Sequence, residues 1–282
     1  MKINFSDRDI TVSLCPTGAV PKRTDNPNVP ISAQDIVSQI RECYELGITS
    51  VHLHARNDEE NPVWEKKYYE DIISGIKSTV SEDLAICVTT SGRDWEDYSK
   101  RSDVLRISGD LKPDMASLTL SSLNFKKTAS INSPDTILRL LENMNENGIK
   151  PELEIFDFGM INYMHYLIAS DLLKPPYIVN LILGNSFSAP ANFNTLGNLL
   201  SELPEESVIQ VGGIAKSQFV ANVLGMVSNN GIRVGLEDNI KNNRNPEHQP
   251  TNLDLLSESL KVASALGKKV MKASEFKELI RA

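Results

Sequence analysis

Short apolar segments alternate with amphipathic segments along the whole chain. The amphipathic segments repeat apolar residues every three or four positions, as in Ile36, Ile40 and Cys43, which is the pattern of a helix with one buried face. The apolar segments have the length of strands. We predict strands at residues 10–15, 51–54, 85–90, 115–118, 152–156, 177–183, 208–211 and 232–236.

Helices are predicted between these strands, and capping residues mark several of their starts. Ser32 can cap one helix, Ser133 and Pro134 supply a cap and a first-turn proline, and Ser274 is the expected cap of a terminal helix. A long loop is expected at residues 238–251. We predict helices at residues 33–46, 66–80, 94–104, 134–147, 160–170, 196–203, 217–226 and 252–266, followed by the terminal helix.

Eight strand–helix units in about 260 residues are typical of the α/β class and of a (β/α)8 TIM barrel. An open, doubly wound sheet is the alternative. The first strand is followed by Cys15-Pro16-Thr17-Gly18, however, which lacks the glycine-rich turn that binds dinucleotides. No linker, low-complexity segment or repeat interrupts the chain, so a single domain over residues 1–282 is expected.

Composition narrows the choice of partner and compartment. A formal net charge of −8 and a pI near 5.2 argue against nucleic acid or a membrane surface as partner. Residues 1–5 lack the apolar run of a signal peptide, and no apolar stretch reaches the roughly 18 residues of a membrane span. Cys15, Cys43 and Cys87 are odd in number and widely spaced, which suggests reduced thiols in a cytoplasmic protein. A small-molecule partner is therefore expected.

Two histidines end the second predicted strand. Side chains alternate between the faces of a strand, so His52 and His54 point the same way while Leu53 points into the packing layer. Histidine is the commonest protein metal ligand, and the pair can hold one metal ion from a rigid base. The alternative is two polar residues satisfied by neighbouring carboxylates, and the pair alone does not decide between them.

The barrel fold brings further polar residues to the same end, because active sites of this fold lie at the carboxyl ends of the strands. Barrel closure brings Glu237 within reach of the two histidines. Two histidines and a carboxylate form a ligand set that suits catalytic zinc and also non-haem iron(II). Arg233 and Asp238 form either an ion pair that clamps substrate or a structural salt bridge. The strand-end residues are Thr17, His52, His54, Thr89, Ser117, Thr119, Glu237 and Asp238.

The motifs resemble those of the β-keto acid cleavage enzymes, and the resemblance spans nearly the whole chain. A His-x-His-x-Arg motif and an Arg-x-x-x-Glu-Asp-Asn motif are specific when they occur together. The matching segments lie at residues 17–19, 25–31, 52–56, 112–118, 124–125 and 233–239, in the family's order. The resemblance implies a zinc-dependent (β/α)8 barrel, commonly a homotetramer, that converts a β-keto acid and acetyl-CoA into acetoacetate and a shortened acyl-CoA.

The resemblance also implies residue roles. The zinc ligands match His52, His54 and Glu237, and the general base matches Asp238, held by Arg233. Hydroxyl groups near the substrate match Thr89 and Ser117, while Thr17, Val20 and Thr119 are expected to border the substrate.

Two departures from the family concern specificity. Val20 stands where the member that acts on an amino-substituted keto acid carries a glutamate, so a substrate without positive charge is expected. Its tail is expected to be apolar first and anionic second, since Lys22 and Arg93 add positive charge at the rim unless they are simply solvated. Residues 183–187 replace the family's glycine-rich turn after the sixth strand, and Lys216 is a candidate for a coenzyme phosphate.

Other functions remain open from the residues alone. A zinc or iron(II) barrel with another reaction, such as a hydrolase or aldolase, shares the ligand set without needing acetyl-CoA. A non-catalytic binding protein is a third possibility, against which the intact polar set argues. His165 on a helix and His248 in a proline-flanked loop are expected to be structural or exposed.

Overall fold

The computed structural model describes residues 9–241 and 247–281, so residues 1–5 and the part of the 238–251 loop at 242–246 lie outside the described residues. The strands follow one another around a closed barrel in the order β1-β10-β9-β8-β7-β4-β3-β2. They are β1 (Val12–Leu14), β2 (Ser50–Leu53), β3 (Ala85–Val88), β4 (Met115–Thr119), β7 (Lys150–Ile155), β8 (Tyr177–Leu183), β9 (Ser207–Gly213) and β10 (Gly231–Val234).

All neighbouring barrel strands run parallel, and the last strand closes on the first. β1 pairs with β10 with Ser13 opposite Arg233, and it pairs on its other side with β2, where Leu14 is opposite Val51. The closure confirms the predicted TIM barrel and excludes the open doubly wound sheet. It also places the ends of β10, β1 and β2 side by side.

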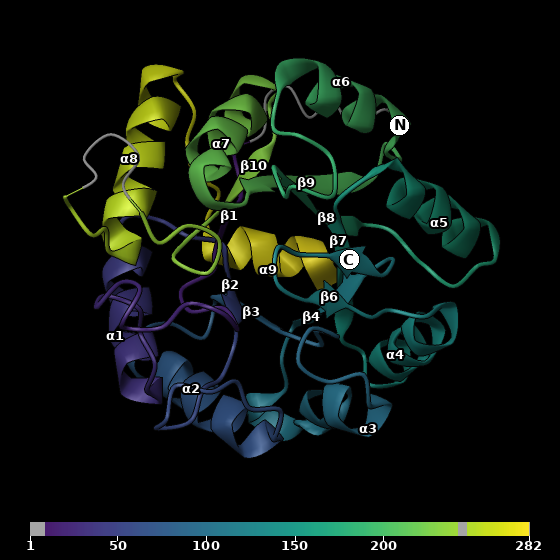
Figure 1. Ribbon diagram of the computed structural model, residues 1–282, viewed down its shortest axis with the longest axis horizontal. Helices are drawn as coiled ribbons and strands as arrows, with labels where there is room; N and C mark the ends of the chain where they lie inside the picture. Colours follow the sequence, from purple (N-terminus) through teal and green to yellow (C-terminus); the bar gives the residue numbers. More distant parts are fainter. Residues whose placement is uncertain (1–8, 242–246, 282) are drawn as a thin grey trace.

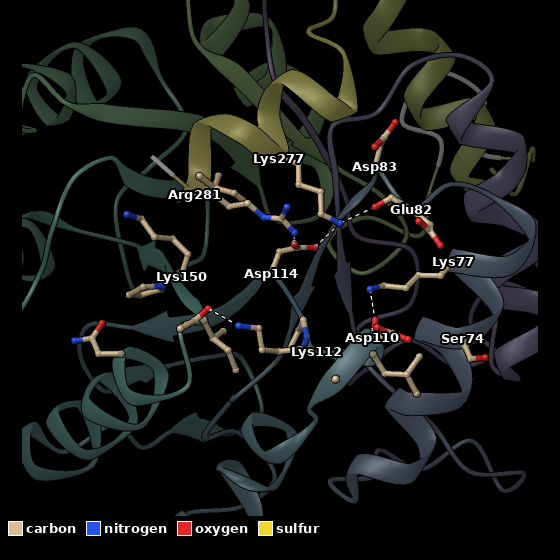
Figure 2. Close-up of a pocket in the computed structure, with 18 of the residues that line it drawn as sticks. Ser74, Lys77, Glu82, Asp83, Asp110, Lys112, Asp114, Lys150, Lys277 and Arg281 are labelled. Carbon is tan, nitrogen blue, oxygen red and sulfur yellow. Dashed lines mark hydrogen bonds and ion pairs between the residues drawn. The ribbon is translucent and has the colours of Figure 1, made fainter.

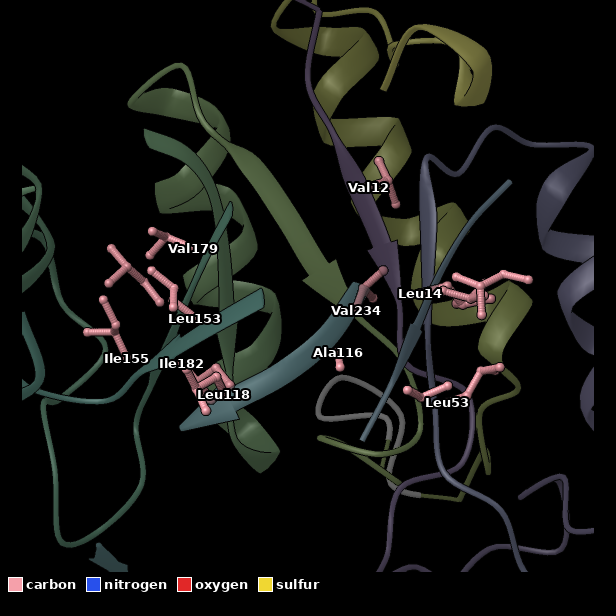
Figure 3. Close-up of a cluster of buried hydrophobic side chains, with 14 of the residues drawn as sticks. Val12, Leu14, Leu53, Ala116, Leu118, Leu153, Ile155, Val179, Ile182 and Val234 are labelled. Atoms are coloured by element: carbon pink, nitrogen blue, oxygen red, sulfur yellow. The ribbon is translucent and has the colours of Figure 1, made fainter. Parts of the chain in front are cut away.

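Helices surround the barrel as a ring (Figure 1). A core of aliphatic side chains fills the layer between strands and helices, and Figure 3 shows Leu14, Leu53 and Val234 among them. The helices are α1 (Ala33–Tyr44), α2 (Lys66–Thr79), α3 (Tyr98–Arg101), α4 (Pro134–Glu146), α5 (Phe158–Ala169), α6 (Phe193–Glu202), α7 (Gln218–Val227), α8 (Asn252–Ala265) and α9 (Ala273–Arg281).

Several local predictions need correction. The segment predicted as one helix at 94–104 contains only the single turn α3, followed by a 3-10 turn at Asp103–Arg106. Ser274 lies inside α9 rather than before it, because the helix begins at Ala273. A short antiparallel pair, β5 (Leu123–Asn124) with β6 (Ala129–Ser130), was not predicted, since two-residue strands leave no periodic signal. The predicted caps Ser32 and Ser133 are confirmed, each accepting a hydrogen bond from a first-turn amide.

The terminal helix α9 closes the amino-terminal end of the barrel and crosses the middle of the ring in Figure 1. Phe276 and Ile280 enter a cluster with residues of β3, β4, β8 and β9, which are Ala85, Cys87, Met115, Ile178 and Val208. Beside this cluster, Asp114 is paired with Lys277 (3.2 Å) and Arg281 (3.1 Å), as Figure 2 shows. At this end α9 therefore packs apolar side chains against the strands, and the charges of Asp114, Lys277 and Arg281 are paired.

The three cysteines are buried and form no disulfide, as predicted from their spacing. None of the helices within the described residues has both the length and the apolar character needed to cross a bilayer.

Candidate metal centre

The interior of β2 supplies the first ligand of the candidate centre. His52 is fully buried, and its Nδ1 lies 3.0 Å from Oε2 of Glu152 on β7. That contact fixes the ring, and it leaves Nε2 buried without a hydrogen-bond partner among the described residues. His54 follows the end of β2, and its ring centroid lies 5.2 Å from that of His52. The shared face predicted from their spacing is confirmed.

A sharp turn after β10 brings in the carboxylate. The strand was predicted to extend to residue 236 but ends at Val234, because Gly235 adopts a φ of +151°. A side chain at Gly235 would place its Cβ 2.1 Å from the Cys15 carbonyl oxygen, so the turn requires glycine. Gly18 likewise packs against Glu237, where an added Cβ would lie 2.6 Å from Cγ. The close packing at these two glycines positions Glu237 next to the end of β1.

The three predicted ligands come together. Glu237 Oε1 lies 3.5 Å from Nε2 of His54 and 3.9 Å from Nε2 of His52, and the ligand atoms of all three lie within 4.8 Å of one another. Tetrahedral zinc with bonds of about 2.0–2.2 Å places its ligand atoms roughly 3.3–3.5 Å apart. Glu237 Oε2 is also buried without a hydrogen-bond partner. The separations of Glu237 Oε1 from the two histidine nitrogens are close to those of a zinc site, and His52 Nε2 and Glu237 Oε2 have hydrogen-bonding capacity left for a metal ion.

The charge state of the set agrees with this fit. Burial alone would raise the pKa of Glu237, but Arg233 and the two histidines hold that pKa well below its ordinary value. Burial would lower the pKa of His52, but Glu237 and the Glu152 hydrogen bond outweigh it and raise that pKa. Because histidine binds metal in its neutral form, a metal ion at Nε2 would compete with a proton there.

Arg233 organises the acidic groups beside the ligands. Its guanidinium is 1% exposed, with Nε 2.9 Å from Asp238 Oδ2 and a terminal nitrogen 2.7 Å from Glu237 Oε1. The other terminal nitrogen lies 3.7 Å from Glu154 Oε1. Burial raises the pKa of Asp238, and Glu237 acts in the same direction, while Arg233 opposes both. The raised pKa moves Asp238 toward the range in which a carboxylate is an effective base at neutral pH.

Glu152 and Glu154 were missed by the sequence analysis. They alternate on β7 and both reach the barrel interior, where Glu152 also lies 3.1 Å from the Cys87 thiol and Glu154 accepts a hydrogen bond from Thr119 (2.6 Å). The sequence offers only a pair of carboxylates two residues apart in a predicted strand, a pattern that is equally typical of a strand with one solvated face. Burial would raise the pKa of Glu152, but its contact with His52 lowers the pKa below the ordinary value.

The predicted hydroxyl residues lie in or directly after the barrel strands. Ser117 is buried on β4, and its Oγ accepts the Thr90 N–H at 3.2 Å. Thr89 follows β3, where its Oγ1 accepts the Ser91 N–H at 3.1 Å, and it borders a small cavity together with His54. Thr17 is fully buried after β1, with a hydroxyl that has no partner among the described residues.

Other predicted residues lie further out. The Val20 side chain is 57% exposed on the loop after β1. Lys216 is exposed in the 3-10 turn Ala215–Ser217, beside a cavity of about 110 Å³. His165 lies on α5 with Nε2 2.7 Å from the Glu202 carbonyl oxygen, and His248 lies 3.3 Å from Asp254. Neither of these histidines belongs to the centre.

Known proteins resemble this chain over nearly its whole length. A family model described as beta-keto acid cleavage enzyme matches residues 9–281. The 3-keto-5-aminohexanoate cleavage enzyme of Acetoanaerobium sticklandii is 28% identical over 272 residues, covering 96% of this chain and 97% of that protein. The 3-oxoadipate:acetyl-CoA acetyltransferase of Cupriavidus necator is 28% identical over 272 residues, covering 95% of this chain and 93% of its own.

A solved structure shares the fold. The ternary complex of ObcA with a C4-CoA adduct and oxalate superimposes with a TM-score of 0.81 at 17% sequence identity. The match covers 91% of this chain and 68% of that chain. At this level of identity the likeness supports the barrel fold alone.

Proposed function

Because the chain belongs to the β-keto acid cleavage enzyme family, we propose that it transfers acyl groups between a β-keto acid and acetyl-CoA. The products would be acetoacetate and an acyl-CoA that is shortened relative to the keto acid. The observation that carries the proposal is the convergence of His52, His54 and Glu237 beside the Arg233–Asp238 pair.

We propose that His52, His54 and Glu237 hold a zinc ion. Their donor atoms are one carboxylate oxygen and two imidazole nitrogens, and the set leaves a coordination position for substrate. When bound, zinc would act as a Lewis acid toward the carboxylate and keto oxygens of the β-keto acid. Glu152 orients His52 through Nδ1 and thereby directs Nε2 at the ion.

Asp238 is the proposed general base. It would remove a proton from C2 of the keto acid, which is acidified by the adjacent carbonyl group. Arg233 holds Asp238 at 2.9 Å through Nε, so the carboxylate that accepts the proton is fixed in place. The pKa of Asp238, which burial raises, favours this role near neutral pH.

The deprotonated C2 carbon would then attack the carbonyl carbon of acetyl-CoA, and the CoA thiolate would leave. The thiolate returns to the original keto carbon, and the bond between that carbon and C2 breaks. This releases the shortened acyl-CoA and, after C2 regains a proton from Asp238, acetoacetate. Thr89 and Ser117 are the proposed donors to the oxyanions that develop at the attacked carbonyl groups. The Ser117 hydroxyl can donate because its oxygen already accepts the Thr90 N–H.

We propose that the substrate carries no positive charge. Val20 offers neither a charge nor a hydrogen bond at the position where an amino-substituted substrate would need a carboxylate. Thr17 and Thr119 are proposed to border the substrate, and Lys216 to approach a coenzyme phosphate. The homotetramer, the single domain and the cytoplasmic location stay predictions.

A direct assay tests the proposal. Zinc-loaded protein is incubated with acetyl-CoA and a panel of β-keto acids, and acetoacetate is measured. Acetoacetate should form only when acetyl-CoA is present, in step with the shortened acyl-CoA. If the keto acid were consumed equally well without acetyl-CoA, the chain would be a metal-dependent hydrolase or aldolase. If no keto acid were consumed, the proposal would be wrong.

A further inference from the structure

Arg93 is a partly buried cation beside the proposed metal centre. Its guanidinium carbon lies 3.5 Å from the centre of the Phe125 ring, and Nε is buried without a hydrogen-bond partner. Burial lowers the pKa of Arg93, while carboxylates of the centre, Glu237 first, act to raise it. An arginine stays protonated under such conditions. A charged donor therefore lies within electrostatic reach of the site.

The other arginines of the barrel mouth have polar partners that the Arg93 guanidinium lacks. The guanidinium of Arg56 donates three hydrogen bonds to carbonyl oxygens, and that of Arg101 donates two to carbonyl oxygens and one to Asn132. Arg233 is held by carboxylates. Within residues 9–241 and 247–281, the Arg93 guanidinium has neither a hydrogen-bond acceptor nor an ion-pair partner.

The loop that carries Arg93 is held firmly in place. Gly92 accepts a hydrogen bond from the Ile131 amide at 3.2 Å, and a Cβ at Gly92 would lie 2.3 Å from the Ile131 carbonyl oxygen. The Arg101 side chain bonds the carbonyl oxygens of both Thr90 and Ile131, at 2.8 and 2.9 Å. The backbone that carries Arg93 is thus held in place, and the guanidinium rests on the Phe125 ring, which reduces the entropy that binding would cost.

We propose that Arg93 binds an anionic group at the far end of the substrate, so that the preferred β-keto acid is a dicarboxylate. This inference rests on the proposed function, which places the reacting end of the keto acid at the metal centre. A carboxylate matches the planar fork of a guanidinium, and it would satisfy the donors that the fold leaves open. The fixed ring of Phe125 holds one face of the guanidinium and leaves its edge for the ligand.

The proposal changes the order of preference expected from Val20. An apolar tail was expected first because Val20 was placed at its side, but that residue is more than half exposed. A partly buried cation with a buried, unpartnered Nε is a stronger determinant than an exposed valine, because leaving a charge without a partner is costly. An anionic tail therefore becomes the first choice and an apolar tail the second.

The test uses two substrates of equal chain length, 3-oxohexanedioate and 3-oxohexanoate. The wild-type protein should have the higher kcat/KM for the dicarboxylate. Arg93→Met should reduce the dicarboxylate-to-monocarboxylate ratio of kcat/KM by about 10- to 100-fold, mainly through KM, as expected for a charge-assisted hydrogen bond. In Arg93→Lys the same ratio of kcat/KM should lie between that of the wild type and that of Arg93→Met. The matched control is Arg139→Met, since Arg139 also stacks on a ring, that of Tyr98, but lies on the outer helix α4; its ratio should stay at the wild-type value.

Three outcomes would overturn the proposal. One is a wild-type preference for 3-oxohexanoate, which needs no variant to detect. Another is an unchanged ratio in folded Arg93→Met. The third is a higher KM for acetyl-CoA with both keto acids, which would assign Arg93 to a coenzyme phosphate.

Binding of unreactive glutarate, measured by calorimetry, separates this inference from the proposed function. If no acetoacetate forms with any substrate, the proposed function is wrong. Glutarate binding that weakens about 10- to 100-fold in Arg93→Met would still support the anion site, and equal binding to both proteins would refute it.

Discussion

The two ends of the barrel are built from the same strands but treat polar groups in opposite ways. At the amino-terminal end, α9 fills the opening with Phe276 and Ile280, and Asp114 pairs with two cations of that helix. At the carboxyl-terminal end, a buried histidine nitrogen and a buried carboxylate oxygen of the candidate centre have no hydrogen-bond partner among the described residues. Buried hydroxyls without partners occur at the amino-terminal end too, as at Ser50 and Ser207, but the charged groups there are paired, whereas the metal centre leaves atoms of ionisable groups without partners.

The difference shows that cavity size is a poor guide to the site in this molecule. A cleft of about 1070 Å³ lies at the amino-terminal end, the closed end that α9 covers, and its lining groups are drawn in Figure 2. Its basic residues already have partners, as Lys112 does in the carbonyl oxygens of Asn147 and Gly148, both at 3.2 Å. The candidate centre is instead marked by ionisable groups with buried atoms that lack partners, because burying such atoms costs free energy unless a ligand binds them.

The largest expected effect follows from removing the proposed base Asp238 at the carboxyl-terminal end of the barrel, the open end that holds the metal centre. Asp238→Asn keeps the shape of the side chain but cannot accept the C2 proton, so turnover should fall by about 10²- to 10⁴-fold. Acetoacetate formation by the zinc-loaded variant measures this. Asp114→Asn at the closed end is the matched control and should keep its turnover at temperatures where it is folded. Retention of more than a tenth of wild-type turnover in Asp238→Asn would exclude Asp238 as the base.

The second effect concerns the closed end and should appear in stability rather than in chemistry. Phe276→Ala removes a fully buried ring from the cluster that α9 forms with the strands. The free energy of unfolding should fall by about 3–5 kcal/mol, as measured by denaturant titration. The folded variant should still bind zinc, because none of the three ligands belongs to the cluster, although its Cys87 contacts Glu152. A loss of zinc from the folded variant would show that the two ends are not separate.

The third effect is smaller and tests how the His52 ring is oriented toward the metal ion. Glu152→Gln keeps a hydrogen-bond acceptor for His52 but removes the charge that makes the ring a better ligand. Zinc affinity should fall about 10- to 100-fold, as for other partners of metal-binding histidines. Glu142→Gln, on the exposed side of α4, is the control and should bind zinc as the wild type does. Equal affinity in Glu152→Gln and the wild type would mean that Glu152 has no part in orienting the ligand.

Much of this architecture could be predicted from the sequence, because the period of a strand is a local property. Alternation alone placed His52 and His54 on one face, and closure of the barrel brought Glu237 to them although it is distant in sequence. The turn at Gly235 was missed because a positive φ has no periodic signature. It mattered little, since Glu237 reaches Arg233 from the turn as it would have from the strand.

Other features depend on tertiary contacts that no local pattern encodes. Glu152 and Glu154 alternate with apolar residues, which in isolation suggests a strand with one solvated face. Only the packing of β7 between β4 and β8 makes that polar face the interior of the barrel. The position of α9 across the opening is also invisible in sequence, because its apolar stripe is compatible with any apolar surface. The sequence indicated Arg93 as a positive charge near the site, but it could not show that the guanidinium lacks a hydrogen-bond partner.

Metal content measures the central claim most directly, namely that His52, His54 and Glu237 hold a metal ion. The chain has only four histidines, so a His52→Ala, His54→Ala double variant can be compared with a His165→Ala, His248→Ala double variant. After zinc loading and gel filtration, the wild type and the second variant should each carry about one zinc per chain. The first should carry almost none while keeping the circular dichroism of the folded barrel. Wild-type zinc content in a folded His52→Ala, His54→Ala protein would contradict the account.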